Sequence, residues 1–270
     1  MKIPKTIEVI CKAWNTAEKK LVEEVSKYSP GRGEECITDC FFVLLQKELE
    51  DASEKELVKT AFIEDLMEEY PDIPAKRIEN FSQGLIAEAL HSRYIEGSKT
   101  GGDFGLIISS PEVERSADRL HFSKIQNGLL CQAKLKRKKK WEELTETQEE
   151  ILPKHLKYLA ITLYRYEDAK FRRLRLGQWF SCKRSSVDKI NNYLKNDFRR
   201  ARLKNSSDVL KALAEQKLGT QDAEIIKDVI APGGSRRFEL RIWWKDKDEY
   251  FSEVINSAIR EEVKISVERS

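Results

Sequence analysis

Three residues on two short apolar segments have the types and spacing needed for metal-assisted chemistry. In TGGDFGLII, residues 100–108, Asp103 directly precedes a run that favours an interior strand. A carboxylate there is costly to desolvate unless a cation lies beside it. In GLLCQAKLK, residues 128–136, strand alternation places Gln132 and Lys134 on one face. If the two strands pair, a carboxylate, an amide oxygen and an ammonium converge at one edge of a sheet.

This set of groups suits the hydrolysis of phosphodiester bonds assisted by Mg²⁺. Mg²⁺ is a hard cation that prefers oxygen ligands, and Asp103 and Gln132 offer a carboxylate and a carbonyl oxygen. Lys134 would orient the attacking water and offset the charge of the transition state. The three residues are therefore the catalytic candidates.

The segments G-G-D-F-G and C-Q-A-K resemble the restriction-endonuclease-like superfamily, whose signature is PD-(D/E)xK. The nearest likeness is to its GxD…QxK variant, found in Mrr-type restriction enzymes. The resemblance implies a central mixed sheet flanked by helices, with the Asp and the x-Lys pair on adjacent strands. It also implies cleavage of DNA with Mg²⁺, which Mn²⁺ can replace. In this chain Gly102 stands in place of the usual proline, and Gln132 in place of the second acid.

The charge that Gln132 lacks makes a further acid important, and the resemblance implies one from the first core helix. Glu34 falls on the apolar face of a predicted helix, and EECIT at 34–38 resembles the E-x-x-[IL]-T opening of that core helix. Glu79, inward on a later predicted helix, and Glu96, across a predicted hairpin from the aspartate, are the alternatives. We expect Glu34 to be the third metal ligand.

Hydrophobic periodicity predicts the elements that must position these residues. Helices are expected at 16–28, at 34–51, after a capping box at 53–56, and at 74–90, 142–163, 185–197 and 248–262. Strands are expected at 91–97 and 100–110, which would form a hairpin, and at 120–124, 128–136, 171–180 and 236–245. This order indicates an α/β or α+β fold. A helical region at 1–90 would contribute the first core helix, and 91–270 would form the nuclease core.

Length and composition bound the class of protein. The chain has 270 residues, of which 40% are hydrophobic and 35% charged, which is typical of a globular protein of one or two domains. No apolar run approaches membrane-spanning length and the first residues lack the apolar centre of a signal peptide, so a cytoplasmic location is expected. The five cysteines form no CxxC pair and are expected to be reduced. Cys36 and Cys40 are expected to pack in the core.

Charge is distributed unevenly along the chain. Residues 1–133 hold 17 Lys and Arg against 24 Asp and Glu, whereas residues 134–270 hold 32 against 22. Basic residues cluster in three runs interleaved with aromatic residues such as Trp141 and Trp179, which favours nucleic-acid binding. The predicted phosphate contacts are Lys136, Arg137, Lys138, Lys139, Lys140, Arg172 and Arg173.

These features predict a Mg²⁺-dependent endonuclease that cleaves DNA. Cutting both strands of a duplex needs two sites, so a homo-oligomer or a partner subunit is expected, with the chain as effector of a restriction or anti-phage defence system. Two alternatives remain open. One is a nuclease-fold subunit that binds DNA with weak or no catalysis, which the amide of Gln132 would explain. The other is an RNase.

Overall fold

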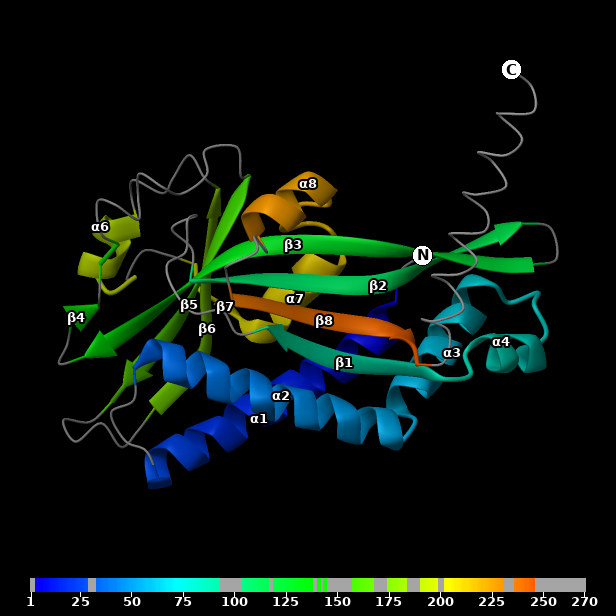
Figure 1. The fold of residues 1–270 in the computed structure, drawn as a ribbon, viewed down its shortest axis with the longest axis horizontal. Helices are drawn as coiled ribbons and strands as arrows, with labels where there is room; N and C mark the ends of the chain where they lie inside the picture. Colours follow the sequence, from blue (N-terminus) through cyan, green and yellow to red (C-terminus); the bar gives the residue numbers. More distant parts are fainter. Residues whose placement is uncertain are drawn as a thin grey trace, which may run out of the picture.

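The structure, a computed structural model, places helices on both sides of a central mixed sheet (Figure 1). It describes residues 3–28, 33–92, 103–116, 119–137, 140–141, 143–144, 157–167, 174–183, 190–198, 202–230 and 236–245. The predicted α/β class with a mixed sheet is confirmed. No helix within the described residues is both long enough and apolar enough to cross a membrane.

Eight strands of the described residues form one sheet in the order β1-β8-β2-β3-β5-β6-β7, with β4 paired to the end of β3. Their bounds are β1 Leu85–Ser92, β2 Phe104–Ser116, β3 Arg119–Arg137, β4 Lys140–Trp141, β5 Tyr158–Tyr166, β6 Leu174–Lys183, β7 Lys204–Asn205 and β8 Arg236–Trp244. The β2–β8 and β3–β5 pairs are parallel and the other pairs are antiparallel. A long β2–β3 hairpin therefore forms the centre of the sheet.

The helices carry apolar residues along one side, and they bury that side against the sheet. Their bounds are α1 Pro4–Tyr28, α2 Glu34–Glu54, α3 Leu57–Glu69, α4 Ala75–Phe81, α6 Ile190–Lys195, α7 Ser206–Ala214, α8 Ala223–Ile225 and the π-helical turn η2 Ile226–Ile230. In α2 the buried residues recur at helical spacing, from Ile37 through Phe41 and Leu45 to Leu49. In Figure 1, α1 and α2 lie side by side along the sheet.

Alternation along the central strands divides the core into two layers. We call the side packed against α1, α2 and α7 the helix-covered face, and it takes Phe104, Leu106, Cys131, Ala133, Leu135 and Tyr164. The opposite side, which we call the site face, takes Ile107, Leu130, Ile161 and Leu163 and packs against η2 and α6. The central strands are thus buried on both sides, as parallel pairs usually are.

Two predictions around the first strand are wrong. The helix expected at 74–90 ends at Phe81, and residues 85–92 form β1. The described ends of the hairpin expected between 91–97 and 100–110 do not pair with each other, because β8 lies between β1 and β2 and pairs with both. The helical region therefore gives way to the sheet at Leu85, before the predicted boundary.

Other predicted boundaries also change. The strands expected at 120–124 and 128–136 are one strand, β3, and the helix expected at 142–163 gives way to β5 from Tyr158. The part of that helix at 145–156 and the helix at 248–262 lie outside the described residues.

The capping box predicted at 53–56 is also wrong. The N-cap of α3 is Glu56, which has a φ of 55° and makes no capping hydrogen bond through its side chain. Ser53 instead binds the backbone of β1, because its Oγ donates to the oxygen of Ala87 and accepts from its nitrogen, both at 3.0 Å.

Candidate active site

Backbone pairing brings Asp103 beside the segment that carries Gln132 and Lys134. Phe104 pairs with Cys131 in the β2–β3 ladder, and the Asp103 amide donates to the Cys131 carbonyl at 2.9 Å. The Asp103 side chain then reaches across, since its Oδ2 accepts a hydrogen bond from the backbone nitrogen of Ala133 at 2.8 Å. The predicted pairing of these strands is confirmed, and the carboxylate is fixed beside the residue between Gln132 and Lys134.

Gln132 and Lys134 lie on the site face, where alternation along β3 places them. Gln132 is 0% exposed and Lys134 is 3% exposed, whereas Asp103 is half-buried. Within the described residues no carboxylate forms a salt bridge with the Lys134 ammonium, and no hydrogen bond to that group is found. A lysine that is largely buried and has no carboxylate partner favours the approach of an anion to this face.

The Asp103 carboxylate acts electrostatically on its neighbours. Burial raises the pKa of the Cys131 thiol, and the negative charge of Asp103 raises it further. Cys131 lies on the helix-covered face, so it is an inert core thiol and leaves the chemistry to the other face.

Glu34 is the first residue of α2, and a hydrogen-bonded chain joins this turn to the sheet. Thr38 Oγ1 lies 2.8 Å from the Glu34 carbonyl oxygen and 2.8 Å from the hydroxyl of Tyr164 on β5. The pKa of Tyr164 is raised, chiefly by burial and to a lesser extent by the charge of Glu34. Its hydrogen bonds with Thr38 and Thr162 act in the opposite direction. The start of α2 is therefore anchored to the strand next to β3. α2 packs on the helix-covered face, whereas Gln132 and Lys134 lie on the site face, and that Glu34 is a metal ligand remains a prediction.

The structure describes one of the two alternatives to Glu34. Glu79 was expected to point inwards, but α4 is short and leaves it exposed, so that prediction is wrong. Glu96 lies outside the described residues. Sequence reasoning missed Thr38 and Tyr164, although a threonine one turn after a candidate acid is a signal for such an anchor.

Asp103 and Gln132 carry oxygen donors of the type that Mg²⁺ takes. Within the described residues, no group of three or more His, Cys, Asp or Glu side chains is placed to hold a metal ion. Mg²⁺ keeps several waters and binds through one or two carboxylates together with substrate phosphate. The carboxylate of Asp103 and the amide oxygen of Gln132 would be protein ligands of this kind.

The predicted phosphate contacts are only partly described. Lys136 Nζ forms a salt bridge with Asp197, whose carboxylate also accepts from Trp141 Nε1 at 2.8 Å. Burial alone would raise the pKa of Asp197, but the hydrogen bonds from Lys136 and Trp141 outweigh it and lower this pKa. Lys136 thus has an internal partner, and it lies 5.6 Å from the Trp141 ring centre. Sequence reasoning missed Asp197.

Of the remaining basic candidates, Lys140 is exposed at β4. The side chain of Arg137 and the residues Lys138, Lys139, Arg172 and Arg173 lie outside the described part of the structure. Trp179, which was grouped with the basic runs, is a core residue at 3% exposure and offers no surface for a base.

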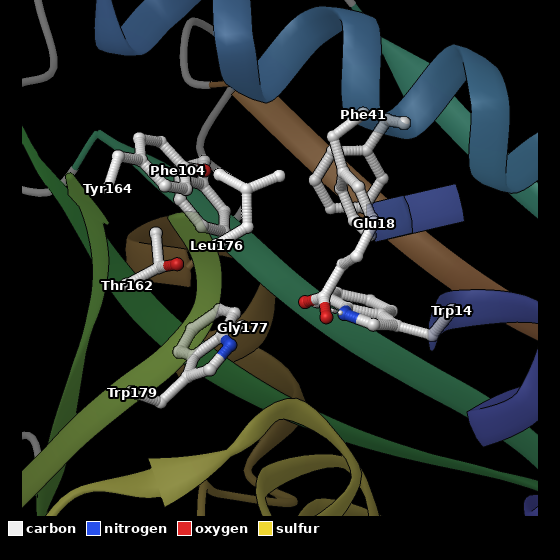
Figure 2. Close-up of a pocket in the computed structure, with 10 residues that line it drawn as sticks. Trp14, Glu18, Phe41, Phe104, Thr162, Tyr164, Leu176, Gly177 and Trp179 are labelled. Atoms are coloured by element: carbon white, nitrogen blue, oxygen red, sulfur yellow. Dashed lines mark hydrogen bonds between the residues drawn. The ribbon is translucent and has the colours of Figure 1, made fainter. Parts of the chain in front are cut away.

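An aromatic cavity lies on the helix-covered face of the sheet (Figure 2). Among its polar groups is the carboxylate of Glu18 on α1, which accepts from Trp14 Nε1 at 2.8 Å and from Ser206 Oγ at 2.5 Å. Burial raises the pKa of Glu18, although both hydrogen bonds lower it. Gly177, at φ +78°, leaves room for this carboxylate, since a Cβ there would lie 2.7 Å from Glu18 Oε2. Glu18 is half-buried and lies on the helix-covered face, opposite Gln132 and Lys134.

Comparisons with models of protein families, with curated proteins and with solved structures gave no match.

Proposed function

We propose that this protein is a Mg²⁺-dependent endonuclease with a restriction-endonuclease-like core. Its site would comprise Asp103, Gln132 and Lys134, with Glu34 as the further acid. Support for the core comes from the element order, in which α2 precedes β1, β2 and β3, and β5 then pairs in parallel with β3. Asp103 directly precedes β2 and the Gln-x-Lys segment lies in the adjacent strand β3, which agrees with the arrangement that the resemblance implies.

The single observation that carries the proposal is the state of Lys134. The Lys134 residue is 3% exposed and has no carboxylate partner within the described residues, while the Asp103 carboxylate accepts a hydrogen bond from Ala133, the preceding residue of the same strand. A phosphodiester bound there would supply the missing anion. The neighbouring Lys136, which is only half-buried, does have a carboxylate partner in Asp197.

Each group then has a role that its surroundings support. Asp103 and Gln132 would hold Mg²⁺ through a carboxylate and an amide oxygen, and the bound ion would polarise the scissile phosphate. The hydrogen bond from the Ala133 amide holds the Asp103 carboxylate in place, as partners behind metal ligands commonly do. Lys134 would orient the attacking water and offset the charge that develops on the phosphate oxygens. DNA is the proposed substrate, with a second copy or a partner subunit needed to cut both strands.

The test is a cleavage panel with purified protein. Supercoiled plasmid, linear duplex, single-stranded DNA and RNA are each incubated with Mg²⁺, with Mn²⁺ and with EDTA. We expect cleavage of DNA that requires a divalent ion. Cleavage of RNA alone would favour the RNase alternative. Binding of DNA with the same affinity in all three conditions, without any cleavage, would favour a DNA-binding subunit and end the enzymatic proposal.

A further inference from the structure

The outer side of the first turns of α2 carries two thiols one turn apart. The Sγ atoms of Cys36 and Cys40 lie 4.0 Å from each other. Cys40 is exposed and Cys36 is half-buried, while the neighbouring residues Ile37 and Phe41 face the core. The expectation that both cysteines pack in the core is therefore wrong for Cys40. Core packing does not explain why two thiols are placed together at the surface.

The spacing of the pair suits a shared metal ion better than a disulfide. A disulfide needs Cβ atoms about 3.8 Å apart. Residues four apart on a helix have Cβ atoms roughly 5–6 Å apart, so oxidation would distort the turn. Zinc–sulfur bonds of about 2.3 Å at a tetrahedral angle instead place two sulfurs about 3.8 Å apart. The observed 4.0 Å is close to that value without movement of the helix.

We propose that Cys36 and Cys40 form a bidentate thiolate site for a soft divalent cation of the Zn²⁺ class. Thiolates select such ions, whereas the oxygen donors near Asp103 suit Mg²⁺. Since the described residues gather no group of three or more metal-ligating side chains, the pair would supply two ligands and leave the other positions to water or an external donor. This inference concerns a different face of α2 and does not depend on the nuclease proposal.

The experiment is a Cd²⁺ titration of the reduced protein, followed by the ultraviolet charge-transfer absorption of cadmium–thiolate bonds, with Zn²⁺ as competitor. We expect one ion per chain, displaced by Zn²⁺. Cys36→Ser and Cys40→Ser should each weaken binding on the order of 10-fold or more, because the second thiolate is no longer supplied at high effective concentration. The double variant should lose the absorption. Asp103→Asn should keep it, which separates this site from the proposed Mg²⁺ site.

The controls use the rest of the chain. The double variant retains Cys182 and the buried Cys11 and Cys131, and so measures the background from the other cysteines. Serine is nearly isosteric with cysteine, and circular dichroism checks that each variant folds. An undiminished absorption in the double variant, wild-type affinity in either single variant, or no absorption in the wild type would overturn the proposal.

Discussion

The two faces of strand β3 differ in how they treat polar groups. On the helix-covered face, Ala133 and Leu135 join an apolar layer, and the polar groups nearby are tied to one another, as Thr38 is to Tyr164. On the site face the same strand carries Gln132 and Lys134, both largely buried, and Lys134 has no carboxylate partner within the described residues. The difference is that the polar groups on one face have partners within the protein, whereas the lysine on the other face could take an anion as its partner. Substitutions on the two faces should therefore fail in different ways.

The largest effect is expected from Phe42→Ala on the helix-covered face. The Phe42 ring is 2% exposed and stacks on Phe238 with ring centres 3.4 Å apart. Its loss should lower the free energy of unfolding by about 3–5 kcal/mol, through lost burial and the cavity left behind. Urea denaturation measures this change. The control is Val43→Ala, because Val43 is 57% exposed and should change stability by less than about 0.5 kcal/mol. Equal losses in the two variants would remove the contrast.

Lys134→Met tests the other face. Methionine keeps most of the buried volume but removes the charge, so the fold should persist. Cleavage of plasmid in Mg²⁺ should slow by on the order of 10²-fold or more, while DNA affinity changes little. Rates are compared in single-turnover assays, and binding in a filter or polarisation assay. Cleavage at the wild-type rate would place the activity elsewhere.

The basic run that follows β3 should act on binding and not on catalysis. If Lys138, Lys139 and Lys140 contact phosphates, replacing all three by alanine should flatten the log–log salt dependence of DNA affinity by up to about 3, at roughly 0.9 for each contact. The Mg²⁺ requirement for cleavage should stay the same. Lys211→Ala, at an exposed lysine on α7, serves as the control. A triple variant with the wild-type slope would show that this run is a solvated surface.

The smallest effect is expected from Glu18→Gln. Burial raises the pKa of Glu18 above its ordinary value of 4.5, so the folded chain binds this proton more tightly than the unfolded chain. Its contribution to stability is therefore present at low pH and is lost as the pH rises through that raised pKa. Glutamine can keep both hydrogen bonds without a charge, so the variant should melt at a higher temperature at pH 7 and at the wild-type temperature near pH 4. A variant less stable than wild type at pH 7 would refute this reading.

Local patterns predicted the pairing beside Asp103 better than they predicted the rest of the sheet. The pairing of β2 with β3 follows from alternation and a short connection, both visible in the sequence. The place of β8 between β1 and β2 depends on a pairing over some 150 residues, which no local pattern encodes. The segment LIAEALHS contains good helix formers, and it forms a strand because it has β8 as a partner and α2 as a cover.

Two other failures have the same origin. In YLAITLYRY, burial on both faces removes the alternation that would have marked β5 as a strand. The hydroxyl of Ser53 could either cap α3 or bind the backbone of a strand. It binds the backbone of Ala87 in β1 and does not cap the helix. The Lys136–Asp197 salt bridge likewise could not be foreseen, because it joins residues 61 apart.

Asp103→Asn tests the central claim most directly, through the rate of plasmid cleavage as Mg²⁺ is varied. Asparagine can still accept the hydrogen bond from the Ala133 amide, so the fold should be retained while the metal-binding charge is lost. Glu79→Gln, at an exposed acid of α4, is the matched control. We predict that the wild type and the control cleave only with a divalent ion, and that Asp103→Asn is slower by about 10²-fold or more even at saturating Mg²⁺. Wild-type cleavage by Asp103→Asn would contradict the assignment of this site.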